Sequence, residues 1–343
     1  MLTAIHYAKG NGGHIPLFTH PLTKTLEDWW FQHGLSQDEQ FTLLLDEYMV
    51  VLGEKVAELK QAHINEGEDG ARRFGMSGAG SCTRKSGLKL LGHRGEPFSG
   101  STLFTFFLGH LLEPMAIAML RINGLIVDGA QEPARIDPFM ASFSDGIIRA
   151  FHGESTEDAV LSVKTAGFKG SMKRGAKFIR HGFAQLPFDG VRQSNPSWWV
   201  QAQAECYALG INQALFVVLA KDQIKAMEGD PYLESLAFYT ELVPYDQRFC
   251  EDVLLPTWQR QWDAVEAGNA GPAAVFSGVT GQYVNIVAPA LAGKQRPHPN
   301  VNADLGLFFN HCEPVYCEFN AVCAQQLARE YQQPRRAAPA LAG

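Results

Sequence analysis

The sequence predicts an α/β protein in which helices flank a central sheet. Three observations lead to this fold class. Apolar runs with strand character lie at residues 159–163 and 214–220. Between them, residues 196–209 carry the signals of a helix, and residues 24–65 carry apolar side chains at helical spacing. A helix between two buried strands is typical of a sheet that helices cover.

The N-terminal region, residues 1–70, is predicted to be a helical extension with two helices. Thr25 opens the first helix. Ser36 and Glu39 open the second, because a Ser with a Glu three positions later satisfies free N–H groups at a helix start. Apolar residues of the second helix recur at helical spacing, at Leu43, Leu44, Tyr48, Val51, Leu52 and Val56. A glycine-rich stretch, residues 67–80, is predicted to be a loop.

The predicted main domain, residues 71–330, contains further elements with local signals. They are a helix over 101–122 that stops at Asn123-Gly124, two strands within 142–165 joined by a polar turn, a helix over 196–209, a buried strand over 214–220, and a helix over 256–267. The helix over 196–209 has Asn195 as its predicted N-cap and Gly210 as its terminator. Residues 331–343 are predicted to be a disordered tail.

Composition and charge exclude several classes of protein. The chain has 343 residues and a formal net charge of −7, so any contact with DNA must come from a local basic patch. We expect no membrane span, because no apolar run approaches about 20 residues, and no secretory signal is recognised. A cytoplasmic protein is therefore expected. Its six cysteines are predicted to be thiols or metal ligands rather than disulfides.

An acid and a lysine on neighbouring predicted strands form the first candidate for chemistry. Asp145 stands just before Gly-Ile-Ile, and Lys164 follows Ala-Val-Leu-Ser-Val. Residues i and i+2 of a strand point to the same face, so Ser162 and Lys164 share a face. Lys164 is therefore placed to meet a phosphate or an attacking water, with Asp145 holding a metal ion from the neighbouring strand. Taken alone, Asp145 would be interpreted as an acid in an ordinary turn, and Lys164 as a lysine that faces solvent on an edge strand.

Two further polar pairs lie at helical spacing. His110 and Glu113 stand three residues apart on one face of an apolar helix, where buried polar groups need a partner. Gln203 and Tyr207 stand one turn apart on the helix over 196–209, so they also share a face. Taken alone, His110 and Tyr207 would be interpreted as core residues, and Glu113 and Gln203 as surface residues.

The order of these motifs resembles the PD-(D/E)XK nuclease superfamily, in its RecB and lambda-exonuclease branch with the iron–sulfur-bearing CRISPR-associated exonucleases. The resemblance covers about residues 75–325 and implies a restriction-endonuclease-like fold with a central mixed sheet. It implies catalytic roles for Glu113, Asp145, Lys164, Gln203 and Tyr207. It also implies a Mg²⁺ or Mn²⁺ site formed by His110, Glu113, Asp145 and the backbone carbonyl of Val163.

Ser162 departs from this pattern, which places Asp or Glu two residues before the lysine. A hydroxyl is a weak, neutral ligand for Mg²⁺. Three explanations stay open. In the first, another acid takes the place of the missing one, with Glu157, Asp158 and Glu205 as candidates. In the second, a natural Asp or Glu has been replaced by Ser through engineering. In the third, the protein is a natural, weakened nuclease that still binds DNA.

Four cysteines form a second candidate metal site. Cys312, Cys317 and Cys323 cluster near the C-terminus, and Cys82 lies far upstream. Four thiolates suit a [4Fe–4S] cluster, and the resemblance implies one that joins the two ends of the domain in a C-terminal cysteine-bearing segment. The spacing between Cys312 and Cys317 is longer than the resemblance implies. We rank the cluster first, unliganded buried cysteines second and a structural zinc site third.

A basic segment surrounds Lys164. Residues 159–188 contain no acid, and they carry Lys169, Lys173, Arg174, Lys177 and Arg180. Such a local positive charge suits a phosphate backbone. Its glycines predict a flexible loop that closes over a nucleic-acid strand, and Arg84 is predicted to extend the basic surface.

These features together predict a metal-dependent DNA exonuclease that acts in recombination, repair or phage replication, in a bacterial or phage-infected cell. Its expected partners are DNA ends, single- or double-stranded, a recombination or single-strand-annealing protein, and a second copy of the chain. Two alternatives remain. One is a DNA-end-binding subunit whose nuclease site is degenerate because of Ser162. The other is an interaction protein stabilised by zinc.

Overall fold

The computed structural model describes most of the region between residues 20 and 285. The described ranges are 20–34, 38–65, 73–128, 133–149, 157–174, 177–221 and 237–285, with positions 319 and 323. Side chains of 58–65, 168–181 and 285 lie outside this description. The predicted divisions of the chain near residues 70 and 330, and the predicted tail, fall outside these ranges and stay predictions.

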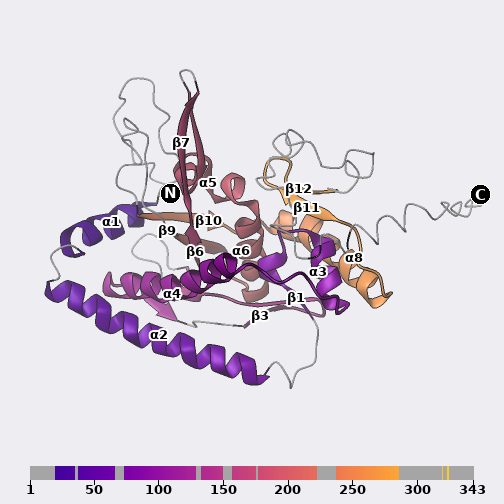
Figure 1. Ribbon diagram of the computed structural model, residues 1–343, viewed down its shortest axis with the longest axis horizontal. Helices are drawn as coiled ribbons and strands as arrows, with labels where there is room; N and C mark the ends of the chain where they lie inside the picture. Colours follow the sequence, from indigo (N-terminus) through magenta and orange to yellow (C-terminus); the bar gives the residue numbers. More distant parts are fainter. Residues whose placement is uncertain are drawn as a thin grey trace, which may run out of the picture.

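A five-stranded mixed sheet forms the centre of the protein (Figure 1). Its strand order is β10 (Phe238–Pro244), β9 (Gln213–Ala220), β6 (Ala159–Ala166), β5 (Gly146–Arg149) and β2 (Ile126–Asp128). β6 and β9 run parallel, and the other neighbours run antiparallel. The two central strands are the apolar runs recognised in the sequence. The predicted α/β class, with a mixed sheet flanked by helices, is confirmed.

Side chains of β6 alternate between two cores on the opposite faces of this sheet, as the strand period requires. Leu161 and Val163 pack with α4 (Gly100–Ile122), in a cluster that also takes in α1 (Pro21–His33) and α2 (Glu39–Asn65). Val160 packs on the other face, in a cluster with the helix α6 (Pro196–Leu209). A residue on β6 therefore faces either the α4 side or the α6 side.

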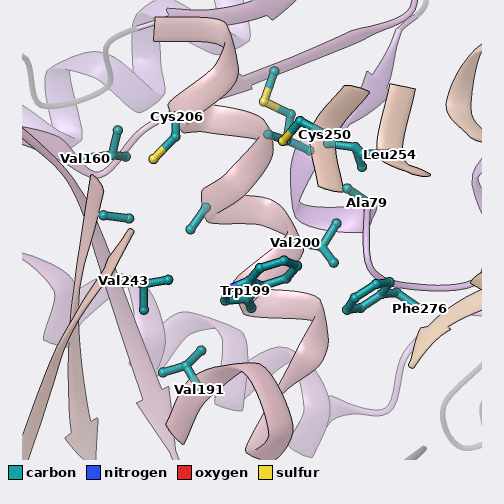
Figure 2. Packing of buried hydrophobic residues seen from close by; sticks show 14 of the residues in the cluster. Ala79, Val160, Val191, Trp199, Val200, Cys206, Val243, Cys250, Leu254 and Phe276 are labelled. Carbon is teal, nitrogen blue, oxygen red and sulfur yellow. The ribbon is translucent and has the colours of Figure 1, made fainter. Parts of the chain in front are cut away.

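The helix α6 (Pro196–Leu209) has the bounds that the sequence predicts. Gly210 ends it in the left-handed conformation, at φ 67°, where a glycine is favoured. Asn195 is its N-cap residue, as predicted, but the Asn195 side chain bonds no backbone N–H of the helix, and its Oδ1 accepts a hydrogen bond from the Ser197 hydroxyl instead. Figure 2 shows Trp199 and Val200 of α6 in the core with Phe276. α6 is therefore a core helix that is buried on several sides.

The helices near the N-terminus also follow the prediction. α1 and α2 correspond to the two predicted helices, but α1 begins at Pro21, four residues before the predicted start at Thr25. The second begins at Glu39, where the Asp38 carboxylate accepts a hydrogen bond from the backbone N–H of Phe41 at 3.1 Å. Ser36, predicted to open this helix, lies outside the described residues. Within the stretch predicted as a loop, residues 74–78 form the short strand β1 (Phe74–Gly75) and a turn of 3₁₀ helix.

Three small sheets accompany the central one. They are β1–β4–β3, with β4 (Met140–Phe143) and β3 (Pro133–Ile136); β11 (Ala274–Ser277) with β12 (Gln282–Asn285); and β7 (Phe168–Arg174) with β8 (Lys177–Gly182). The segment predicted as two strands over 142–165 is thus corrected. Its first residues belong to β4 in a different sheet, and β5 begins only at Gly146.

The basic segment is a β-hairpin, so its prediction as a flexible loop is wrong. β7 and β8 pair antiparallel, and Figure 1 shows the hairpin rising well above the body of the protein. The register shifts between Phe168 and Ser171, where Gly170 lies. A glycine inside a strand often marks such an irregularity rather than the end of regular structure.

The remaining helices complete the core on the α6 side. They are α3 (Thr83–Leu90), α5 (Leu186–Ser194), α7 (Gln247–Phe249) and α8 (Leu255–Glu266), which corresponds to the helix predicted over 256–267. A short π-helix, Cys250–Leu254, joins α7 to α8.

The helix α4 is long and apolar enough to span a membrane by length and composition, contrary to the expectation from the sequence. Its C-terminal half packs instead against the central sheet. Ala116, Ile117, Met119 and Leu120 are buried there with side chains of β6 and β9. This half of α4 is therefore a core helix of the α/β fold.

Candidate active site

Asp145 and Lys164 meet where β5 begins and β6 ends. The Lys164 Nζ lies 3.9 Å from the Asp145 Oδ2, and only 15% and 17% of these side chains are exposed. The same Oδ2 accepts a hydrogen bond of 2.7 Å from the backbone N–H of Val163. Val163, predicted to offer its carbonyl to a metal, thus contacts Asp145 through its N–H. The structure brings together the acid and the lysine that the sequence predicts.

The glycine after Asp145 lets the chain take this path. Gly146 has φ 153°, which side chains rarely allow, and an added Cβ would lie 3.0 Å from Val127 Cγ1. A side chain here would therefore need both a rarely adopted backbone conformation and a small shift of Val127 on the neighbouring strand β2. The backbone at position 146 thus favours glycine directly after Asp145.

Glu113 reaches the same place from α4. Its carboxylate forms an ion pair with Lys55 at 2.5 Å, and both side chains are largely buried. Burial raises the pKa of Glu113, the charge of Asp145 raises it further, and Lys55 and Lys164 lower it. Since Asp145 and Lys164 both affect this pKa, Glu113 belongs to the same cluster of charges.

Lys55 was not recognised from the sequence. It comes from α2, in the region predicted to be only a helical extension. A signal was nevertheless present, since Leu44, Tyr48, Val51 and Lys55 follow one another at spacings of four, three and four residues. Leu44 and Val51 are buried. A lysine that continues an apolar helical stripe indicates a buried partner of opposite charge.

Glu205 approaches from α6, on the opposite face of the sheet. It is fully buried, and its Oε1 accepts hydrogen bonds from Gln201 Nε2 at 2.9 Å and from the Ser142 hydroxyl at 3.3 Å. Burial raises the pKa of Glu205 to about 7, Lys164 lowers it in part, and Asp145 raises it. Glu113 and Glu205 therefore both feel the charges of Asp145 and Lys164, from two sides.

The other acids considered as replacements at position 162 lie elsewhere. Glu157 is exposed. Asp158 forms an ion pair with Arg149 at 2.6 Å. Neither influences the pKa of Glu113 or Glu205. Of the three candidates, the structure brings only Glu205 to the cluster.

Two serine hydroxyls in this region have no hydrogen-bond partner. Ser162 Oγ and Ser144 Oγ are both buried, and neither forms a hydrogen bond within the described part of the chain. Buried hydroxyls nearly always have a partner in native proteins. Ser162 lies two residues before Lys164, and Ser144 precedes Asp145. The unsatisfied groups thus lie beside the candidate catalytic residues.

Gln203 does not orient Lys164, so this predicted role is wrong. Its Oε1 accepts a hydrogen bond from the backbone N–H of Asp246 at 2.6 Å, and its Nε2 donates one to the Pro244 carbonyl at 3.1 Å. Tyr207, one turn along on the same stripe of α6, is 39% exposed. No hydrogen bond joins Tyr207 to Lys164 within the described part of the chain. Gln203 instead fixes the chain beyond β10.

His110, predicted as a metal ligand, is exposed on α4, and its side chain forms no hydrogen bond or ion pair with a described residue. Among the described residues, no three His, Cys, Asp or Glu side chains lie close enough together to hold a metal ion. Glu113 and Asp145 do offer carboxylate oxygens of the kind that Mg²⁺ and Mn²⁺ prefer. In chemical type, these residues fit a hard divalent cation.

Arg84 is not part of a basic surface, which corrects the prediction that it contacts DNA. The residue is buried, and its Nη1 donates a hydrogen bond to the Gly271 carbonyl at 2.8 Å. The guanidinium holds the loop after α8 against α3. The other predicted DNA contacts are Lys169, Lys173, Arg174, Lys177 and Arg180, which lie along β7 and β8, with side chains outside the described residues.

Two of the four predicted cluster cysteines are described. Cys82 is buried immediately before α3, and Cys323 packs against a small core that contains Leu88 of α3. Residues near the C-terminus therefore return to the helix that follows Cys82. Cys312 and Cys317 lie outside the described residues, so the predicted cluster remains a prediction. Cys206 and Cys250 are buried in the core, as expected for residues outside such a cluster.

Comparisons with known proteins add little to this geometry. No family model and no curated protein matches the sequence. Among solved structures, the alkaline exonuclease LHK-Exo from Laribacter hongkongensis is 12% identical, with a TM-score of 0.37 over 58% of this chain and 90% of that one. Its complex with dAMP gives 13% identity, a TM-score of 0.33 and coverage of 58% and 88%. The protein SSO0001 is 14% identical, with a TM-score of 0.32 over 64% of this chain and 85% of that one. At these scores the likenesses carry no argument about activity.

Proposed function

We propose that this protein is a divalent-metal-dependent nuclease that hydrolyses phosphodiester bonds in DNA. One observation carries the proposal. Glu113 from α4, Asp145 before β5 and Lys164 on β6 come from three separate segments and form one buried cluster of charges. Burying several charged groups together is costly unless they act on one another or on a ligand. Clusters of ionisable groups that include one of raised pKa, as Glu113 is here, are typical of catalytic sites.

The chemistry of these residues suits attack by water on a phosphate. A divalent cation bound by Glu113 and Asp145 would supply a water of lowered pKa and neutralise charge on the phosphate. Lys164 offers an ammonium group beside that position, where it stabilises the negative charge that develops on the phosphate oxygens. The backbone N–H of Val163 fixes the Asp145 carboxylate, so this acid needs little rearrangement to act.

The hairpin β7–β8 supports DNA as the substrate. β7 begins four residues after Lys164, and its two strands carry five of the basic residues of the acid-free segment. A basic arm joined directly to the site would hold the phosphate backbone without reading its sequence. The proposal extends the resemblance noted above to an exonuclease that acts in recombination, repair or phage replication.

The proposal also includes a [4Fe–4S] cluster and protein partners. The iron–sulfur cluster is supported by Cys323, which packs near Leu88 of α3, the helix that follows Cys82. The support for a partner, whether an annealing protein or a second copy, is the apolar surface of the first half of α4. There Leu103, Phe104 and Phe107 are all more than half exposed. Exposed apolar patches of this kind mark interaction sites.

One observation favours a second function. Ser162 lacks a carboxylate, which would make the protein a DNA-end-binding subunit with a degenerate site. Incubation of end-labelled linear DNA with Mg²⁺ or Mn²⁺ separates the two. We expect cleavage by the wild-type protein and its loss in Lys164→Ala. An inactive wild-type protein that becomes active as Ser162→Glu would instead support the binding function.

A further inference from the structure

The ion pair between Lys55 and Glu113 joins the helix α2 to the candidate active site. Lys55 Nζ donates to Glu113 Oε1 at 2.5 Å, and only 11% and 13% of the two side chains are exposed. Glu113 also feels the charges of Asp145 and Lys164. Within the described part of the chain, Lys55 forms no other side-chain hydrogen bond or ion pair. Any effect of Lys55 on the site is therefore expected to pass through Glu113.

We propose that Lys55 is a positioning residue of the nuclease site, which fixes the Glu113 carboxylate beside Asp145 and Lys164. The inference rests on the proposed function. It makes α2, which the sequence places in an N-terminal helical extension, a part of the site itself.

The attachment of α2 to α4 does not require a buried lysine. The two helices run side by side (Figure 1), and Leu44 and Val51 of α2 are buried in the core that they share. A second ion pair joins the same helices, because Arg121 of α4 bonds Glu47 at 3.0 Å and Glu54 at 3.4 Å. An apolar residue at position 55 would continue the buried stripe without the cost of burying a charge.

The Lys55 pair lies where a catalytic group needs support. Buried ion pairs add little stability compared with apolar side chains of similar volume, so stability alone does not explain this one. Glu113 stands eight residues before Arg121, which is about 12 Å along the helix, and only Glu113 belongs to the cluster of charges.

The hydrogen bond of Lys55 holds one oxygen of this carboxylate. The ammonium group donates to Oε1, whereas Oε2 of Glu113 forms no hydrogen bond with a described residue. One oxygen is thus fixed, and the other is left to act in the site. Residues that support a reacting group in this way are needed to keep it in its productive geometry.

The test compares matched substitutions of the two ion pairs between α2 and α4. Lys55→Met keeps the apolar stem and removes the charge, and Lys55→Arg keeps a charged donor to the carboxylate. Arg121→Met is the control, because it removes the other ion pair between the same helices. Steady-state cleavage of end-labelled linear DNA with Mg²⁺ gives kcat and KM. Fluorescence anisotropy with the same DNA in EDTA measures binding without activity, and thermal unfolding gives the folded fraction.

We expect Lys55→Met to lower kcat per folded molecule by about 10- to 100-fold, as for the loss of a supporting residue, with KM and DNA binding unchanged. Lys55→Arg should keep most of the turnover, and Arg121→Met should keep kcat even where it lowers stability. If Lys55→Met does not fold, Lys55→Gln removes the charge with a neutral donor in its place, and its kcat should fall in the same way.

Three outcomes would overturn the inference while the wild type still cleaves DNA. The first is a folded Lys55→Met or Lys55→Gln variant with normal kcat. The second is an equal loss of kcat in Arg121→Met, which would reduce Lys55 to holding two helices together. The third is weaker DNA binding that accounts for the whole loss of cleavage, which would make Lys55 a DNA contact. A wild-type protein that cleaves no DNA would overturn the proposed function, and the inference with it.

Discussion

Two stripes of residues on different faces of α6 carry similar side chains but make different contacts. Gln201 and Glu205 stand one turn apart and face the cluster of charges around Lys164. Gln203 and Tyr207 also stand one turn apart, but Gln203 bonds the chain beyond β10. The stripes are about 200° apart around the helix, since each residue turns it by about 100°. A pair recognised by spacing alone can therefore be structural, while the neighbouring pair faces the site.

Asp145→Asn should have the largest effect, because it removes the charge that both glutamates feel. We expect cleavage to fall by a factor on the order of 10²–10³, as for the loss of one key electrostatic group. The amide oxygen can still accept from the Val163 N–H, so folding should change little. Single-turnover cleavage of labelled DNA measures the effect. Full activity in a folded Asp145→Asn variant would separate this residue from the chemistry.

Lys55→Met tests the α4 side of the cluster. It leaves the buried Glu113 without its ion-pair partner, which should lower the free energy of unfolding by about 3 kcal/mol without metal. If the cation binds Glu113, saturating Mn²⁺ should stabilise Lys55→Met more than the wild type. Thermal unfolding with and without Mn²⁺ measures both effects. Equal stabilisation of the two proteins would argue against Glu113 as a metal ligand.

Gln203→Ala tests the structural stripe of α6. It leaves the Asp246 N–H and the Pro244 carbonyl without their partner, at a cost of about 1–3 kcal/mol. Cleavage per folded molecule should stay unchanged, in contrast to Asp145→Asn. Urea unfolding and cleavage kinetics on the same preparation measure the two effects. A Gln203→Ala protein of normal stability and lost activity would reverse the assignment of the two stripes.

Glu27→Gln tests whether a raised pKa is enough to identify a residue of the candidate active site. Its effect on the protein should be the smallest of the four. Burial raises the pKa of Glu27 to about 7, although this residue caps the backbone N–H groups of Ala237 and Phe238, away from the cluster. Between pH about 4.5 and 7 the folded state keeps a proton that the unfolded state has released. Stability therefore falls as pH rises through this window.

The Glu27→Gln variant should lose less stability across this pH window than the wild type, and its cleavage of DNA should be unchanged. Urea unfolding from pH 4.5 to 7.5, compared with the wild type, measures the difference. The same slope in both proteins would mean that Glu27 does not hold a proton in the folded state.

Local signals predicted much of the fold. Pro196 and Gly210 placed both ends of α6, and the apolar runs placed β6 and β9. The hairpin β7–β8 was missed because its glycines resemble loop residues, whereas pairing between strands decides its structure. Asp145 and Lys164 were found because they lie on neighbouring strands.

Lys55 and the burial of Arg84 depend on tertiary packing between distant segments, which no local spacing records. Glu205 was one candidate among three in the sequence. Only the position of α6 over β6 separates it from Glu157 and Asp158.

The most direct test of the account is a crystal structure with Mn²⁺, located by its anomalous scattering. The account predicts a peak bound by carboxylate oxygens of Asp145 and Glu113, close to Lys164. An occupied Mn²⁺ site elsewhere, with these carboxylates free of metal at saturating concentration, would contradict it.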